Sequence, residues 1–252
     1  MSNKVLHEAQ PAFVLHSYAF RETSLIVELF SRDHGRVALV ARGARRPKSA
    51  LRGMLLAFQP LTLTWGGKGE LKTLHRAEWQ GGMPQLQGMA LMCGFYLNEL
   101  LVRLLPRDDP HEDLFEMYRK TLQSLCALDE HAAALRRFEK HLLKELGYAM
   151  QLETDTDSGH RIKAQGRYLY LLERGPVEAG GSAGENRVEL DAQNGQIGQI
   201  LDGQTLLDMA RDDYSNPITL QQSKALMRLL INHHLNGQAL HTRQLLKDMQ
   251  QL

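Results

Sequence analysis

The spacing of apolar residues changes once along the chain, at Gly81 and Gly82, and this change limits the possible folds more than any other feature. Before it, short runs rich in Val, Leu, Ile and Phe have the pattern of β-strands. After it, apolar residues recur every three or four positions, as they do in α-helices. The sequence therefore predicts a β domain over residues 1–80 and a helical domain over residues 81–252.

We expect about five strands in the first 80 residues. Their runs lie at 12–20, 23–30, 36–43, 58–67 and 70–78. Gly35 suits the turn between the second and third runs, because glycine accepts a positive φ. Five strands in so short a segment are typical of a small closed barrel such as the OB-fold. A short sandwich has a similar number of strands, so the strand number alone does not choose between the two.

The segment after residue 81 predicts a helical-bundle domain with an irregular insertion. Helices are expected at 89–106, from a cap at Asp109-Pro110 onward, and at about 130–146. Residues 149–195 are rich in Thr, Asp, Ser and Gly, and we expect an irregular excursion there with one hairpin at most. Helical spacing returns at 204–211, 220–235 and 242–249.

Charge is divided unevenly between these two parts. The formal net charge is +1, but residues 1–80 hold 12 Lys or Arg and six acidic residues, a balance of +6, and the remainder carries −5. Such asymmetry is typical of chains with a nucleic-acid-binding end. Two isolated cysteines, no signal-peptide pattern and no apolar run long enough for a membrane span predict a cytoplasmic protein.

The strongest candidate site is the basic run RGARRPKSALR at 42–52, which contains no acidic residue. A guanidinium group binds two phosphate oxygens at once through two parallel hydrogen bonds. Each neutralised phosphate also releases counterions, which gives affinity for nucleic acid of any sequence. A solvated, flexible basic loop is the alternative. The aromatic residues available for base stacking are few, and several are expected in the core, so charge should dominate. The candidate nucleic-acid ligands are Arg42, Arg45, Arg46, Lys48 and Arg52.

A second candidate is the helix at 130–146. Arg136, Lys140 and Lys144 recur every four residues beside an apolar stripe, and Arg137 lies next to them. This surface suits a short acidic peptide ending in a hydrophobic residue, or it is simply the solvated side of a helix. The sequence contains no catalytic, phosphate-loop, calcium-binding or zinc-protease pattern, so no enzyme activity, metal or cofactor is predicted.

Several stretches together closely resemble the bacterial RecO family of recombination and repair proteins. They are the run from residue 12 to 53, FQPLTLTWGGKGELKTL (58–74), YLNELLVRLLP (96–106), LRRFEKHLLKELGY (135–148) and LNGQALHTRQLL (235–246). The resemblance implies an N-terminal OB-fold followed by a helical domain. It also implies a nucleoid-associated, non-enzymatic mediator that binds single- and double-stranded DNA, anneals strands and, with RecR, helps to load RecA.

The resemblance assigns roles to both candidate sites. The basic run would contact the DNA backbone, and Arg136, Arg137 and Lys140 would dock the acidic, phenylalanine-ended tail of single-strand-binding protein. Many relatives carry four zinc-binding cysteines after LGY, but residues 153–160 and the following loop contain none. We therefore expect a zinc-free insertion held by packing alone. An RNA-binding OB-fold protein and a helical protein–protein scaffold remain alternative functions.

Overall fold

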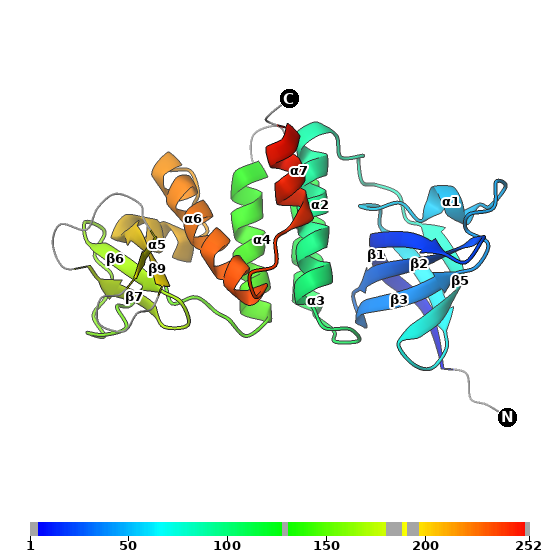
Figure 1. Ribbon diagram of the computed structural model, residues 1–252, viewed down its shortest axis with the longest axis horizontal. Helices are drawn as coiled ribbons and strands as arrows, with labels where there is room; N and C mark the ends of the chain where they lie inside the picture. The colour runs from blue at the N-terminus through cyan, green and yellow to red at the C-terminus, as the bar shows by residue number, and fades with distance from the viewer. Residues whose placement is uncertain (1–4, 128–130, 180–187, 191–196, 250–252) are drawn as a thin grey trace. The chain divides into compact units, whose positions relative to one another are not determined.

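The computed structural model, shown in Figure 1, describes residues 5–127, 131–179, 188–190 and 197–249. The chain divides into two compact units. The first, the barrel unit, comprises Met1–His131 with Ala239–Leu252, and the second, the mixed unit, comprises Ala132–Gln238. The predicted division into 1–80 and 81–252 separates the barrel strands from the rest of the chain, whereas the compact barrel unit also includes the helices up to His131 and the C-terminal segment.

The first 80 residues form a closed five-stranded barrel with the order β1-β2-β3-β5-β4. Its strands are β1 (Leu6–Phe20), β2 (Ser24–Ser31), β3 (Gly35–Ala41), β4 (Leu61–Gly66) and β5 (Leu71–Trp79). Neighbouring strands are antiparallel, except that β3 and β5 pair in parallel and so close the barrel. The barrel is OB-like and is followed by a helical region, which confirms the predicted fold class and excludes the sandwich.

Strand β2 over most of its length, and β1 over residues 12–15, are buried on both faces. On β2, Val27 and Leu29 point into the barrel core with Trp65, whereas the alternating Phe30 packs outside it against helix α3 (Glu112–Ser124). Phe13 of β1 does the same, with its ring centroid 5.4 Å from that of Phe115. Successive strand residues point to opposite faces, so a strand covered on both faces appears as a continuous apolar run.

Polar contacts join the barrel to α2 (Gly88–Leu104) and to the segment before α3. The buried Asn98 side chain donates from Nδ2 to the Leu15 carbonyl at 2.8 Å, and the Tyr118 hydroxyl donates to Asn98 Oδ1 at 2.5 Å. Gly35 has φ +63°, and a Cβ there would lie 1.8 Å from the Asp109 carbonyl oxygen. The expected helix start at Asp109-Pro110 is wrong, because α3 begins at Glu112 after this close approach.

The last helix, α7 (His241–Met249), returns to the barrel unit and packs against α2. Glu99 of α2 accepts hydrogen bonds from the backbone amides of His241 and Thr242 at 2.8 and 2.9 Å, and from the Thr242 hydroxyl at 2.8 Å. Burial alone would raise the pKa of Glu99, but these hydrogen bonds hold it below its usual range. A charged Glu99 therefore satisfies the free amides at the start of α7.

The mixed unit contains a four-stranded antiparallel sheet with the order β7-β6-β9-β8, so the expectation of one hairpin at most in 149–195 is wrong. The missed strands are three to six residues long, and several adjoin Gly- and Asp-rich turns, which hides their pattern. Residues 180–187 of the predicted loop lie outside the described residues. The elements are α4 (His131–Glu145), β6 (Arg167–Leu171), β7 (Gly175–Glu178), β8 (Val188–Leu190), β9 (Ile197–Asp202), α5 (Gly203–Ala210) and α6 (Pro217–His234).

The loop before this sheet is organised by Asp155, which is 3% exposed. Its Oδ1 accepts from the amides of Asp157 and Ser158 at 2.9 and 2.7 Å, and its Oδ2 accepts from the Glu178 amide at 2.6 Å. Burial raises the pKa of Asp155, but these hydrogen bonds outweigh that effect and lower it. The expectation that packing alone holds the insertion is therefore wrong, since a buried carboxylate joins its loop to β7.

Candidate nucleic-acid interface

The basic run 42–52 connects β3 to the short helix α1 (Leu51–Met54). Buried apolar side chains hold it to the barrel, because Ala44 and Leu55 both belong to the barrel core. Between these anchors the chain forms successive turns, and its charged side chains extend into solvent. All five predicted nucleic-acid ligands are exposed: Arg42, Arg45, Arg46, Lys48 and Arg52.

Arg45 differs from the other four because it also shapes the loop. Its guanidinium donates to the carbonyls of Arg21 and Glu22 at 3.2 Å each, and its backbone amide donates to the Thr23 carbonyl at 2.9 Å. These contacts attach the run to the turn between β1 and β2. Sequence reasoning grouped Arg45 with the other ligands, and no local pattern could separate it, because its partners lie more than 20 residues away.

The remaining cations of the run are not neutralised by the protein. Within the described residues, no acidic side chain forms an ion pair with any of them. These cations are Arg42, Arg46, Lys48 and Arg52. Their charge is therefore available to an external anion.

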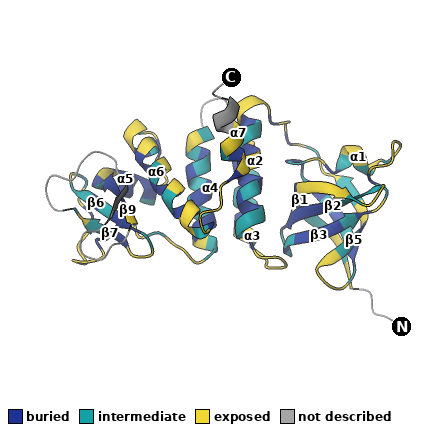
Figure 2. Cartoon of the chain, viewed as in Figure 1, coloured by how far each residue is buried: buried dark blue, intermediate teal, exposed yellow. Residues whose placement is uncertain are grey.

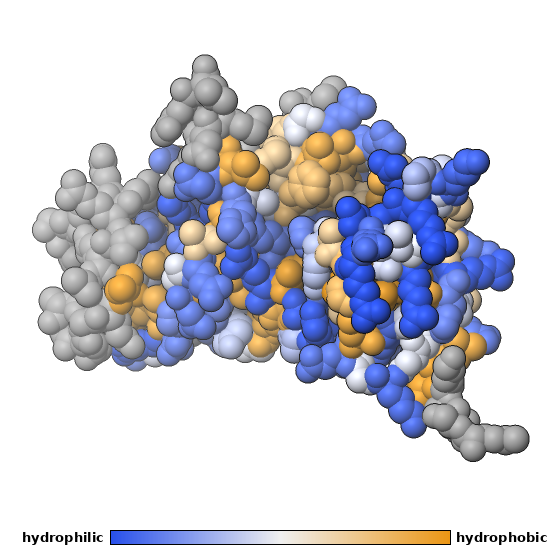
Figure 3. All heavy atoms as spheres, turned by 45° about the vertical axis from the view of Figure 1, so that its right-hand side comes forward, coloured by the Kyte–Doolittle hydropathy of each residue, from blue (hydrophilic) through white to orange (hydrophobic). Residues whose placement is uncertain are grey.

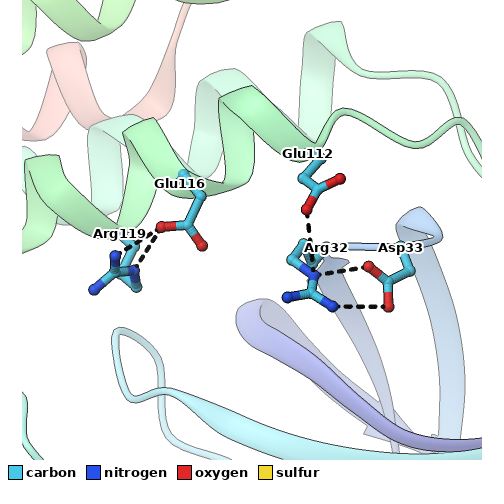
Figure 4. A network of polar contacts seen from close by, with 5 residues as sticks. All are labelled: Arg32, Asp33, Glu112, Glu116 and Arg119. Carbon is cyan, nitrogen blue, oxygen red and sulfur yellow. Dashed lines mark hydrogen bonds and ion pairs between the residues drawn. The ribbon is translucent and has the colours of Figure 1, made fainter.

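Elsewhere on the barrel unit, several cations are paired with acidic residues, as Figure 4 shows for one network. Arg32 lies between Asp33, at 2.8 Å, and Glu112 of α3, at 3.8 Å. The hydrogen bond from Arg32 lowers the pKa of Asp33 below its usual range. Further pairs join Arg107 to Glu28, Lys72 to Asp108 and Arg76 to Glu78. Among the described residues, the basic run is thus the largest group of barrel cations without acidic partners; Arg21 and Lys68 are further exposed cations of this kind.

Aromatic residues of the barrel divide into core and surface groups. Phe13, Phe30, Phe58 and Trp65 are buried, which confirms that several of the aromatics belong to the core. Tyr18 and Trp79 are 42% and 62% exposed. Figure 3, with the barrel side turned forward, shows hydrophilic side chains over the barrel surface with apolar ones among them. The surface thus offers unpaired cations together with a few aromatic faces.

The second candidate site, on α4, has most of its cations engaged within the mixed unit. Arg136 is 8% exposed and forms a 2.7 Å ion pair with the buried Glu139. Lys140 contacts the Met209 carbonyl and the Asp212 carboxylate, each at 2.6 Å. The expected row of solvated cations at i, i+4 and i+8 is therefore interrupted, because its first member is buried.

Arg137, the third residue assigned to this candidate site, is half-buried. Its Nε donates to the Asp212 carbonyl at 3.2 Å, and its guanidinium lies 5.7 Å from the centre of the Tyr214 ring. Arg137 and Lys140 therefore contact the end of α5 and the segment after it, whereas Arg136 is paired with Glu139 on α4 itself. This arrangement places two partly accessible cations, Arg137 and Lys140, near two exposed carboxylates, Asp212 and Asp213.

The described part of the chain shows neither a metal-binding cluster nor a helix suited to a membrane. It contains no group of three or more His, Cys, Asp or Glu side chains placed to hold a metal ion. In the same residues, no helix combines the length and apolar character that crossing a membrane requires.

Comparison with known proteins connects these features to a family. The model of the recombination protein O N-terminal domain matches residues 5–83, and that of its C-terminal domain matches residues 85–244. A DNA repair protein RecO of Nitrosospira multiformis is 54% identical over 250 residues, covering 99% of both chains. One from Aromatoleum aromaticum is 56% identical over 252 residues, the full length of both chains. The chain therefore belongs to the RecO family of DNA repair proteins.

Proposed function

We propose that the protein is a non-enzymatic recombination mediator that binds single- and double-stranded DNA and anneals complementary strands. The observation that carries this proposal is the set of four exposed cations of the basic run without acidic partners. Several other cations of the barrel unit, such as Arg32, Lys72 and Arg107, are paired with acidic side chains. Cations left unpaired on a barrel that is held rigidly to two helices form a surface suited to a polyanion.

The mechanism is electrostatic. Guanidinium groups of the run bind phosphate oxygens, and each neutralised phosphate releases counterions. Two strands held on one protein repel each other less, so base pairing selects the product. Exposed Tyr18 and Trp79 supply faces on which unpaired bases can stack. No covalent step is needed, and no residue is assigned a catalytic role.

The test replaces Arg42, Arg46, Lys48 and Arg52 by alanine and measures binding of a fluorescent oligonucleotide from 50 to 200 mM salt. Four lost contacts to a single strand lower the slope of log affinity against log salt by about 3. A matched control replaces four other exposed cations: Lys120, Lys144, Arg161 and Lys163. If the first variant keeps the affinity and slope of the control, the basic run is not the DNA site.

We further propose that the chain acts with RecR to load RecA onto DNA coated by single-strand-binding protein, at the nucleoid. The family supports this role, and the assay is annealing of coated complementary strands with and without RecR. Acceleration by the chain, increased by RecR, is the expected result. Annealing that is equal with and without the chain contradicts the proposal, and it also distinguishes the mediator from an RNA-binding barrel.

We also propose that α4 docks the acidic tail of single-strand-binding protein. Arg137 and Lys140 support this, since a tail carboxylate can replace the Asp212 carboxylate as the partner of Lys140, while the partly accessible Arg137 guanidinium beside it supplies a second donor. Arg136→Glu would place a second carboxylate beside buried Glu139 and destabilise the mixed unit. A loss of peptide binding in that variant could then result from unfolding as well as from a lost docking contact. The sharper variant is Arg137→Ala with Lys140→Ala. It should weaken binding of an acidic C-terminal peptide and spare naked DNA, and unchanged peptide affinity removes the proposal.

A further inference from the structure

Helix α6 carries a row of polar side chains on the side that faces solvent, visible as exposed positions along the helix in Figure 2. Spacings of three and four residues place these side chains on one helical face, one turn apart. Together with the sheet residue Gln199 they line a cleft of about 400 Å³. The row consists of Gln221, Lys224, Arg228 and Asn232.

The cleft is electrostatically positive. Lys224 and Arg228 are both exposed, and within the described residues neither forms an ion pair with an acidic side chain. Its lining contains no Asp or Glu among the residues that the structure describes. The half-buried Ala225 and Leu229 form an apolar strip beside these charges. The cleft therefore combines two available cations with neutral amide groups.

The opposite side of α6 is fixed by buried hydrogen bonds. Gln222 accepts from the Asp202 amide at 2.9 Å and from the Thr205 hydroxyl at 2.7 Å, and its amide donates to the Asp202 carboxylate at 2.8 Å. Thr219 donates to Asp208 at 2.7 Å. These contacts join α6 to β9 and α5, so the outer row is held in place before any ligand arrives, which reduces the entropy lost on binding.

The length of the row indicates the kind of ligand. It extends over 12 residues from Gln221 to Asn232, which is about 16 Å of helix, with one polar group per turn of about 5.4 Å. A single carboxylate or free phosphate uses only one such group. A chain of regularly spaced anions uses all of them, and the apolar strip suits the sugar faces between the anions. These properties match the phosphate backbone of a single nucleic-acid strand.

We propose that the α6 cleft is a second binding site for the backbone of single-stranded DNA, separate from the basic run of the barrel. This inference rests on the proposed annealing function and deepens it, because annealing requires that one protein neutralise two strands. In this arrangement the barrel holds one strand and the α6 cleft holds its complement. Lys224 and Arg228 neutralise phosphates, while Gln221 offers a neutral hydrogen-bond donor.

The experiment begins with the variant whose basic run is neutralised, so that the remaining affinity for a fluorescein-labelled dT20 oligonucleotide comes from other sites. Adding Lys224→Ala and Arg228→Ala should weaken this binding at least fivefold and lower the salt slope by about 1.4, since two phosphate contacts are lost. The matched control adds Arg161→Ala and Lys163→Ala, which remove two exposed charges of the same unit outside the cleft. Alanine favours helix, so the variant keeps α6, as circular dichroism can verify.

A second measurement uses the otherwise unchanged chain. Lys224→Ala with Arg228→Ala should slow the annealing of complementary strands, while the affinity for the first strand stays close to that of the full chain. If the cleft variant and the control behave alike in both measurements, the cleft inference is overturned. It is also overturned if the cleft variant loses affinity for poly-L-glutamate but not for dT20, because the cleft is then a peptide site. If the full chain binds dT20 without accelerating annealing, the proposed function fails, and the binding measurement still decides the cleft.

Discussion

The hydroxyl group of Tyr118 provides a direct test of what holds the barrel to its helices. It donates to Asn98, and Asn98 in turn donates to the Leu15 carbonyl on β1, so three elements are joined by two buried hydrogen bonds. Tyr118 is fully buried, and burial raises the pKa of its hydroxyl above the usual value. The hydroxyl therefore remains a donor at every pH at which the protein is handled.

Tyr118→Phe removes this donor and leaves the ring contacts with Phe13 and Phe30 in place. The side-chain oxygen of Asn98, a residue only 3% exposed, then loses its hydrogen bond from the hydroxyl. Losing the partner of a buried acceptor costs about 1–3 kcal/mol. For a chain of this size, a loss of 2 kcal/mol lowers the Tm by roughly 4–8 °C.

Tryptophan fluorescence is the suitable measurement, because both tryptophans, Trp65 and Trp79, lie in barrel strands. The signal therefore reports the barrel unit, even if the two compact units unfold separately. The matched control is Tyr18→Phe, which removes a hydroxyl from an exposed residue of β1. The control should change the Tm by less than 1 °C, because an exposed hydroxyl group is hydrogen-bonded to water in both the folded and the unfolded chain.

A double-mutant cycle completes the test. Asn98→Ala alone should cost more than Tyr118→Phe, because it removes both hydrogen bonds. The two changes together should cost less than their sum by about 1–2 kcal/mol, since they remove one shared contact. Equal Tm values for Tyr118→Phe and Tyr18→Phe, or strict additivity in the cycle, would refute the idea that this relay fixes the barrel on α2 and α3.

Three other predictions concern single positions. Gly35→Ala should destabilise the barrel by about 3 kcal/mol, because φ is +63° and the new Cβ meets the Asp109 carbonyl; an unchanged urea midpoint would contradict this. The pKa of Glu99 is lowered in the folded chain, so its stabilisation of α7 is complete above its ordinary value of 4.5 and is lost as the pH falls below that value. The protection of the Thr242 amide against hydrogen exchange, which is the ratio of its intrinsic to its observed exchange rate, should therefore fall as the pH is lowered. A ratio that stays constant argues against the contact. Asp155→Asn should destabilise the mixed unit by about 1–3 kcal/mol in circular dichroism and leave the tryptophan transition unchanged, whereas a shift of both transitions would place its role elsewhere.

The barrel was predictable because its strands are long and their apolar pattern is local. Runs such as 23–30 and 36–43 correspond to β2 and β3 within a few residues. The sheet of the mixed unit was not predictable in the same way. Its strands are short, and the residue types around them favour turns, so only the run at 167–173 carried a strand signal.

The candidate sites show the same division. The exposure of the basic run could be predicted, because five cations without a nearby acid cannot all be buried. The burial of Arg136 could not be predicted from its spacing, although Glu139 three residues later is a possible partner in any helix. The positive row on α6 has a visible signal as well, since Lys224 and Arg228 are four residues apart. Its significance depends on the cleft beside it.

The sequence by itself determined the class of the fold, the position of the change from strands to helices and the family, because each depends on patterns within short stretches of chain. The tertiary structure alone decided which charges remain available. Arg107 pairs with Glu28 across 79 positions of sequence, and Asn98 bonds Leu15 across 83. Such contacts depend on how the elements pack, so only the folded chain distinguishes paired barrel cations such as Arg107 from the unpaired ones at residues 42–52.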